Sequence, residues 1–319
     1  MRMTGPALAF APGSIGNVGP GLDILGLAVD GSGDVVRAEW VDQPGIHVLK
    51  PGHPDLSSDA RQHTSGLAAH AVAARAGADL SRGRGIALSV RKGLPLSGGQ
   101  GGSAASAVAG AVAVNALLGE PLARSELLRA CLVAEETVAG RHLDNIAPSL
   151  LGGMVLIRCM DTLDLVQLPV PEELRVVLVR PEQQLRTAHA RTVLPQEVSR
   201  AVALHQAAQV GALVAALALG DLALLGRSID DRIAEPVRAP LLPGFLEAKA
   251  AALDAGALGS SISGSGPTAF ALTRGQAAGE RVAAAMVTGY LSRGIHSEAR
   301  VTQVDRVGAR LIDDAGDRR

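Results

Sequence analysis

The chain has 319 residues, enough for two domains, and 47% of them are hydrophobic, so a sizeable core can be buried. The formal net charge is −1 and aromatic residues make up only 2%, so we expect no nucleic-acid partner and no attraction to an acidic membrane. Cys131 and Cys159 have no metal-binding spacing, and residues 1–10 lack the pattern of a secretory signal. We therefore expect a soluble cytoplasmic protein.

Strand-like and helix-like segments are mixed along the whole chain. In the first half, strands are predicted at residues 7–11, 35–40, 46–49 and 85–91, and helices at 63–76, 103–118 and 125–138. In the second half, strands are predicted at 154–158, 176–179, 269–273 and 297–304, and helices at 196–219, 221–233, 246–255 and 276–293. The apolar stretch at 210–225 is too short and too interrupted to span a bilayer, so a buried helix is expected there. The mixture indicates an α+β fold in two layers, a two-layer α/β sandwich.

A glycine-dense loop at residues 93–106 gives the strongest local signal. A predicted strand leads into it and a helix of small residues leads out, so its backbone N–H groups could approach an anion closely. It has neither the Gly-Lys-Ser/Thr of a Walker A loop nor the spacing of a dinucleotide-binding loop. A phosphate-binding loop is favoured over a simple connection. Because this loop lacks a lysine, we expect a magnesium ion to supply the positive charge.

Other polar residues stand out in turn-rich or apolar surroundings, and a second glycine-rich turn lies at residues 259–268. These residues are Asn17, Asp23, Glu135, Glu136, His142, Asp144, Asn145, Arg191 and Arg238. Asn and Asp often do no more than shape turns, and a surface Arg is ordinarily solvated, so a structural role is the alternative for each of them.

Taken in order, these segments resemble the GHMP kinase family. Residues 95–106 resemble its phosphate loop, Pro-x-x-x-Gly-Leu-Gly-Ser-Ser-Ala, and residues 263–268 resemble its C-terminal glycine-rich motif. Residues 17–28, 142–153, 190–195 and 231–238 resemble, more narrowly, the homoserine kinases within that family. The resemblance implies the GHMP kinase fold, with an N-terminal ribosomal-protein-S5-like domain at residues 1–165 and a C-terminal ferredoxin-like domain at residues 166–319.

The resemblance also implies roles for individual residues. The ATP phosphates would be wrapped by Pro95, Leu96, Ser97, Gly98, Gly99, Gln100, Gly101, Gly102, Ser103, Ala104 and Ala105. The substrate would be bound by Asn17, Asp23, His142, Asn145, Arg191 and Arg238, with Asp23 suited to an ammonium group and the arginines to a carboxylate. Mg²⁺ would be held by Ser103 and by Glu135, or by Glu136 if the alignment is one residue off. Asn145 is a candidate catalytic residue, and Asp144 or Asp23 could accept a proton.

The implied reaction is transfer of the γ-phosphoryl group of ATP to the side-chain hydroxyl of homoserine, a step in threonine biosynthesis. Dimers are common in the family, so a homodimer is expected. Three residues depart from the family pattern: Gln100 replaces a leucine, Gly102 replaces the first of two serines, and Gly16 replaces a commoner alanine. Two alternatives stay open: a GHMP kinase for another small alcohol, such as mevalonate or a sugar, and a catalytically inactive GHMP-fold sensor.

Overall fold

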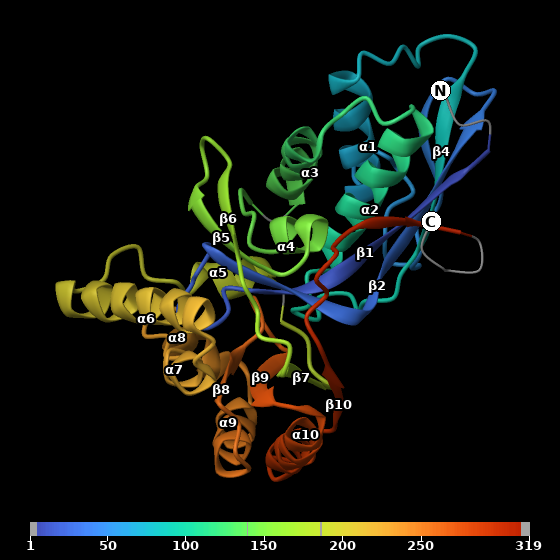
Figure 1. Cartoon of the computed structure of the whole chain (residues 1–319). Helices are drawn as coiled ribbons and strands as arrows, with labels where there is room; N and C mark the ends of the chain where they lie inside the picture. Colours follow the sequence, from blue (N-terminus) through green and yellow to red (C-terminus); the bar gives the residue numbers. More distant parts are fainter. Residues whose placement is uncertain (1–4, 139, 186, 314–319) are drawn as a thin grey trace.

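The structure, a computed structural model, describes residues 5–138, 140–185 and 187–313 and is built on two β-sheets with helices packed on them (Figure 1). The first sheet comprises β1 (Ala7–Gly16), β2 (Leu25–Val41), β3 (Gly45–Lys50), β4 (Gly85–Arg91), β5 (Met154–Cys159), β6 (Asp164–Leu168) and β11 (Arg310–Ile312). The second comprises β7 (Leu174–Pro181), β8 (Gly259–Ile262), β9 (Ala269–Arg274) and β10 (Ser297–Thr302). The pairing of β3 with β4 is parallel, and the other strand pairs in the described residues are antiparallel.

Helices of the first half pack against the first sheet around one hydrophobic core. They are α1 (Thr64–Arg75), α2 (Gly102–Leu117), α3 (Arg124–Val138) and α4 (Ile146–Leu151). α2 is almost entirely buried between the sheet and its neighbouring helices, which its Ala- and Gly-rich sequence permits. A Cβ atom on Gly110 would lie 2.9 Å from the Cβ of Ser65 on α1, so the two helices approach too closely for a larger residue. The phosphate loop therefore leads into a helix that is firmly fixed.

The second sheet has the strand order β10-β7-β9-β8, and its chain order is the β-α-β-β-α-β of a ferredoxin-like fold. Its helices are α5 (Thr187–Thr192), α6 (Arg200–Leu219), α7 (Leu222–Arg227), α8 (Glu235–Arg238), the 3₁₀ helix η1 (Ala239–Leu241), α9 (Phe245–Asp254) and α10 (Gln276–Leu291). Alternate residues of β7 face opposite sides of the sheet, as strand geometry requires. Val176 and Leu178 join a core with Ile15 and Leu27 of the first sheet, whereas Val177 contacts the α9 and α10 side. The predicted α+β fold is confirmed.

The two sheets do not divide the chain at a single point. β6 spans residue 165, where the domain boundary was expected, and it pairs with β5 in the first sheet. β11, near the C-terminal end of the chain, returns to pair with β1, with Leu8 opposite Ile312. The division into residues 1–165 and 166–319 stays a prediction.

The helix α6 differs from expectation. A buried helix was predicted at residues 210–225, but α6 ends at Leu219 and most of its surface is exposed or half-buried. Leu204 and Leu219 are 65% and 77% exposed, and in Figure 1 the helix extends away from the sheets. Within the described part of the chain, α6 is the one helix whose length and composition would suit a membrane span, and 22% of its apolar window is buried. The prediction of a buried helix is therefore wrong for most of this segment.

Candidate active site

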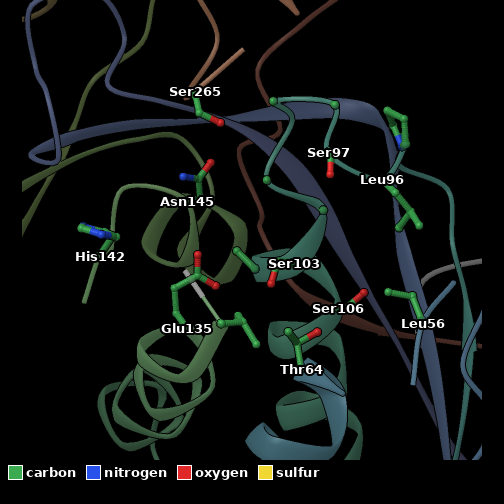
Figure 2. Close-up of a pocket in the computed structure, with 18 of the residues that line it drawn as sticks. Leu56, Thr64, Leu96, Ser97, Ser103, Ser106, Glu135, His142, Asn145 and Ser265 are labelled. Atoms are coloured by element: carbon green, nitrogen blue, oxygen red, sulfur yellow. The ribbon is translucent and has the colours of Figure 1, made fainter. Parts of the chain in front are cut away.

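A cavity of about 560 Å³ lies where the phosphate loop, α2, α3, α4 and the C-terminal glycine-rich turn come together (Figure 2). Both sheets contribute to it: the loop after β4 forms one wall, and the turn between β8 and β9 closes another. Polar residues as far apart in the chain as Asn17 and Ser265 thus face one space.

The phosphate loop, residues 95–106, contains a glycine that no other residue could replace without strain. Gly101 has φ 68° in the left-handed region, and a Cβ atom there would overlap the hydroxyl of Ser14. It directly precedes α2, whose first turn faces the cavity and has no side-chain cap. The unpaired N–H groups and positive end of this 16-residue helix suit a phosphate group.

The C-terminal glycine-rich turn holds the phosphate loop in place. The Ser263 hydroxyl donates a hydrogen bond to the Gly99 carbonyl at 2.6 Å, and the Thr268 hydroxyl donates to the Gly98 carbonyl at 2.5 Å. Gln100 is buried, and its side-chain amide donates to the Thr268 hydroxyl at 3.3 Å. The residue that departs from the family leucine therefore faces the second domain and not the cavity.

Ser103 and Glu135 lie together beside the start of α2 (Figure 2). The Ser103 hydroxyl faces the Glu135 carboxyl and favours its charged form, and the Glu135 oxygen Oε2 is buried without a hydrogen-bond partner. Burial, and then the charge of Asp144, raises the pKa of Glu135 to about 7. Glu136, by contrast, is 44% exposed and pairs with Arg141 at 3.1 Å.

These two residues fit a magnesium ion that arrives with a nucleotide. Among the described residues no group of three or more His, Cys, Asp or Glu side chains forms a complete cation site. Mg²⁺ in phosphoryl-transfer enzymes is usually held by one or two protein groups together with substrate phosphates. A partner-free carboxylate oxygen beside a hydroxyl and a phosphate loop matches that donor set.

Lys92 lies under the phosphate loop and was not among the predicted site residues. Its ammonium group pairs with the fully buried carboxylate of Asp34 and donates to the Gly102 carbonyl at 2.9 Å and the Ser106 hydroxyl at 3.0 Å. The positive charge of Lys92 is thus largely compensated within the protein. The phosphate loop therefore still needs positive charge from another source to bind phosphate groups.

The loop with Asn17 and Asp23 forms the far end of the cavity, and both residues have left-handed backbones, with φ of 69° and 61°. The Asn17 side chain accepts from the Asp23 backbone N–H at 3.1 Å and donates to the Gly264 carbonyl at 2.9 Å. One carboxylate oxygen of Asp23 lies 3.1 Å from Arg191 and 3.4 Å from His142. The Asp23 side chain is 35% exposed and lines the cavity.

Two arginines lie on the same side as Asp23. Arg238 is buried and donates to the carbonyls of Ala190 at 3.1 Å and Gly264 at 3.0 Å. Burial, and then the charge of Arg191, lowers the pKa of Arg238. The Nε atom of Arg191 is buried without a hydrogen-bond partner. Two neighbouring guanidinium groups with unused donors are suited to an anionic ligand such as a carboxylate.

Asp144 and Asn145 stand at the start of α4, between the two ends of the cavity. Asp144 is buried, and its burial, followed by the charge of Asp23, raises its pKa to about 7 although Arg191 opposes the shift. Gly16 makes this arrangement possible, because a Cβ atom there would overlap the Asp144 carboxylate and lie 2.7 Å from the Asn145 amide nitrogen. The departure at Gly16 thus leaves room for two polar side chains of the cavity.

Comparison with known proteins identifies the family. The models of the GHMP kinase N-terminal and C-terminal domains match residues 64–153 and 213–291. The homoserine kinase of Arabidopsis thaliana is 42% identical over 314 residues, covering 95% of this chain and 84% of that one. The homoserine kinase of Chlorobium phaeovibrioides is 41% identical over 316 residues, covering 95% and 98%. The chain belongs to the homoserine kinase family of GHMP kinases.

Solved structures agree with this assignment. A crystal structure of homoserine kinase from Cytophaga hutchinsonii is 40% identical and superposes with a TM-score of 0.92, covering 98% of this chain and 99% of that one. Mevalonate kinase of L. major superposes with a TM-score of 0.70 at 19% identity, with 95% and 97% covered, and shows the shared fold alone. The predicted resemblance to homoserine kinases is therefore confirmed, and with it the GHMP kinase fold.

The structure brings almost all predicted site residues of this homoserine kinase family member to the one cavity. Its lining includes the predicted substrate, metal and catalytic residues, and the phosphate-loop residues except Gln100 and Ala105. Gln100 contacts the second domain and Ala105 is fully buried inside α2. Proximity does not test the roles assigned to these residues, which stay predictions.

A further part of the lining was missed from the sequence. It comprises Asp55, Leu56, Ser57, Gln62, His63, Thr64, Lys92, Val138 and Gln184, whereas Ser106, Gly264 and Ser265 belong to the two glycine-rich segments that the sequence indicated. Within this set, His63 has a structural role. Its Nδ1 accepts a hydrogen bond from the Ser65 backbone N–H at 3.2 Å and caps α1. For Lys92 a signal was present, because the chain has only three lysines and one of them directly precedes the glycine-rich loop. Residues 55–57 form an ordinary polar loop whose position only the fold reveals.

Proposed function

We propose that the protein transfers the γ-phosphoryl group of ATP to the side-chain hydroxyl of L-homoserine. The observation that carries this proposal is one cavity with a phosphate-binding end and an amino-acid-binding end. Ser103 and Glu135 stand at the first end, and Asp23, Arg191 and Arg238 at the second. A single carboxylate with two guanidinium groups matches the ammonium and carboxylate of an α-amino acid.

The nucleotide would lie along the phosphate loop with its phosphates on the first turn of α2. Leu56 and Leu96 line the outer part of the cavity with Thr64 (Figure 2), and they would offer apolar walls and a hydroxyl to the base and sugar. Magnesium held between Ser103, Glu135 and the phosphates would neutralise charge that develops on the transferred group. Magnesium is needed for this because the charge of Lys92 is already compensated by Asp34.

The amino acid would bind with its ammonium at Asp23 and its carboxylate at Arg191 and Arg238. His142 lies beside Asp23, and Asn145 lies between this end and the phosphate loop, within reach of a substrate hydroxyl (Figure 2). These contacts would hold the hydroxyl in line with the phosphoryl group. Positioning of this kind supplies much of the rate enhancement in phosphoryl transfer.

The hydroxyl proton needs an acceptor during or after transfer. Asp144 is a buried carboxylate that lines the cavity, and its pKa of about 7 makes it able to take a proton near neutral pH. Asp23 is less suited to this task because Arg191 and the substrate ammonium would both compete for it. We therefore assign the role of proton acceptor to Asp144.

A coupled assay of ADP release tests the proposal against the two alternatives. We expect turnover with ATP and L-homoserine and at most traces with mevalonate, galactose or threonine. Turnover with mevalonate or galactose in place of homoserine would indicate another alcohol kinase, because mevalonate has no ammonium group and galactose has neither charged group. No turnover with any of them, despite nucleotide binding, would favour a sensor. The homodimer and the cytoplasmic location also stay predictions.

A further inference from the structure

Gln206 on α6 joins two segments that lie on either side of the amino-acid end of the cavity. It is a buried polar residue on a helix whose surface is otherwise largely exposed. Its amide nitrogen donates to the Pro20 carbonyl at 2.7 Å and to a carboxylate oxygen of Asp231 at 2.9 Å. Its amide oxygen accepts from the backbone N–H of Arg232 at 3.1 Å. The Gln206 amide therefore uses both its N–H donors and its oxygen acceptor, and its planar shape fixes the directions of these hydrogen bonds.

The first partner belongs to the loop with the ammonium anchor. Pro20 lies between Asn17 and Asp23, and the Asn17 side chain closes this loop by accepting from the Asp23 backbone N–H. The loop has left-handed residues at both ends, so its conformation depends on contacts from outside. The bond from Gln206 to the Pro20 carbonyl is such a contact.

The second partner belongs to the segment with the carboxylate anchor. The Asp231 carboxylate accepts from the backbone N–H groups of Ile233 at 2.8 Å, Ala234 at 3.1 Å and Glu235 at 2.9 Å. It thereby fixes the turn that leads into α8, the short helix that begins at Glu235 and ends at Arg238. Any shift of Asp231 would move this helix and its arginine together.

We propose that Gln206 is a positioning residue that sets the distance between Asp23 and Arg238. The inference rests on the proposed function, in which these two residues bind the ammonium and the carboxylate of the substrate. Both groups are attached to a single carbon atom in an α-amino acid, so their anchors must keep one fixed separation. Gln206 is bonded to the two supporting segments at once and holds that separation.

The decisive variant is Gln206→Met, which keeps an unbranched side chain of similar length and removes all three hydrogen bonds. We expect the KM for homoserine to rise about tenfold or more, while the KM for ATP stays within about twofold, because the phosphate loop is held by separate contacts. Gln209→Met is the matched control, since Gln209 is half-buried and lies about one turn further along α6. We expect it to behave as the wild type.

A substrate analogue separates positioning from general stability. 3-Amino-1-propanol is homoserine without its carboxylate, so it engages one anchor and does not depend on the distance between the two. We expect the wild type to turn it over slowly and Gln206→Met to match the wild type within about twofold. Equal losses with homoserine and with this analogue, or a parallel rise in the KM for ATP, would show a merely structural role and overturn the proposal.

If Gln206→Met does not fold, Gln206→Glu keeps the shape and the acceptor but loses both donors, and we expect the same selective rise in the KM for homoserine. Wild-type values for Gln206→Glu would overturn the proposal. Absence of homoserine turnover in the wild type would instead refute the proposed function, independently of Gln206.

Discussion

The Ser103 hydroxyl faces the buried Glu135 carboxyl and favours its charged form, and the carboxyl oxygen Oε2 has no hydrogen-bond partner among the described residues. A buried acceptor left unpaired costs about 1–3 kcal/mol, so this arrangement is unfavourable in the free protein. A cation that arrives with the nucleotide phosphates would remove that cost. The pair is thus arranged for a ligand, whereas Glu136 on the outer side of α3 is already paired with Arg141.

The first prediction concerns Glu135→Gln. Because the neutral amide is a poor magnesium ligand, we expect the Mg²⁺ concentration for half-maximal rate to rise about tenfold or more and kcat to fall about 100-fold. Losses of about 10- to 100-fold are typical when residues around a bound metal are replaced. Rates measured against Mg²⁺ at saturating ATP check this. Glu136→Gln is the control and should leave both values unchanged. Equal effects from the two variants would contradict the assignment to Glu135.

The second prediction concerns the two neighbouring glycines at the start of α2. A Cβ atom on Gly102 would lie 3.4 Å from the Lys92 ammonium nitrogen and from the Pro95 carbonyl oxygen, which is ordinary contact. Gly102→Ser, which restores the family residue, should therefore fold and gain about 0.5 kcal/mol from helix propensity. Gly101→Ala should lose about 2 kcal/mol or more, because its backbone is left-handed and its Cβ would overlap Ser14. Thermal unfolding of both variants checks the contrast.

The sequence predicts most of this architecture where local patterns determine structure. The hydrophobic periods of the sequence predict strands and helices in both halves of the chain. The motifs, taken in order, predict the residues that meet in the cavity. The strand predicted at residues 7–11 is too short, because Gly, Pro and Ser at residues 12–16 indicate a loop. In the structure β1 continues there because it pairs with β2, with Ser14 opposite Ala28. Tertiary pairing overrides local preference at such positions.

Contacts between distant residues are the part that the sequence could not supply. Gln206 bonds to the carbonyl of Pro20, 186 positions away, and the Lys92 partner Asp34 lies 58 positions away. Neither pair has a spacing that a helix or strand would reveal. The apolar sequence of α6 even indicates the wrong environment, since hydrophobic composition predicts burial and much of this helix is exposed.

The third prediction concerns the buried pair of Lys92 and Asp34. Asp34 also accepts from the Ser106 hydroxyl at 2.6 Å and from the Gly93 backbone N–H at 3.1 Å, so its charge is bonded on several sides. Removing one partner of a buried pair leaves an uncompensated charge, which typically costs about 3–5 kcal/mol. Lys92→Met should therefore lower the unfolding midpoint by roughly 10 °C. The exposed Lys50 provides the control, and Lys50→Met should change the midpoint by no more than about 1–2 °C.

The pKa of Asp144 makes the stability of the ligand-free protein depend on pH. Its folded-state pKa of about 7 lies above the ordinary value of 3.8, so the folded protein binds a proton that the unfolded chain has released between these values. Stability therefore falls as pH rises from about 4 to about 7. The sign follows from the preference of the folded state for the neutral acid. Glu135 acts in the same direction, and the charge of Asp144 contributes to its raised pKa.

The fourth prediction uses Asp144→Asn, which keeps the shape of the side chain and an acceptor for the Asn17 backbone N–H. The amide cannot titrate and no longer raises the pKa of Glu135. The unfolding midpoint of the variant should therefore fall less between pH 5 and pH 8 than that of the wild type, when both are measured without nucleotide and metal. Since Asp144 is the assigned proton acceptor, kcat should also fall about 100-fold. Full turnover by the variant would remove Asp144 from that role. An unchanged pH dependence of the midpoint would refute the titration itself, so the two measurements test separate properties of one carboxylate.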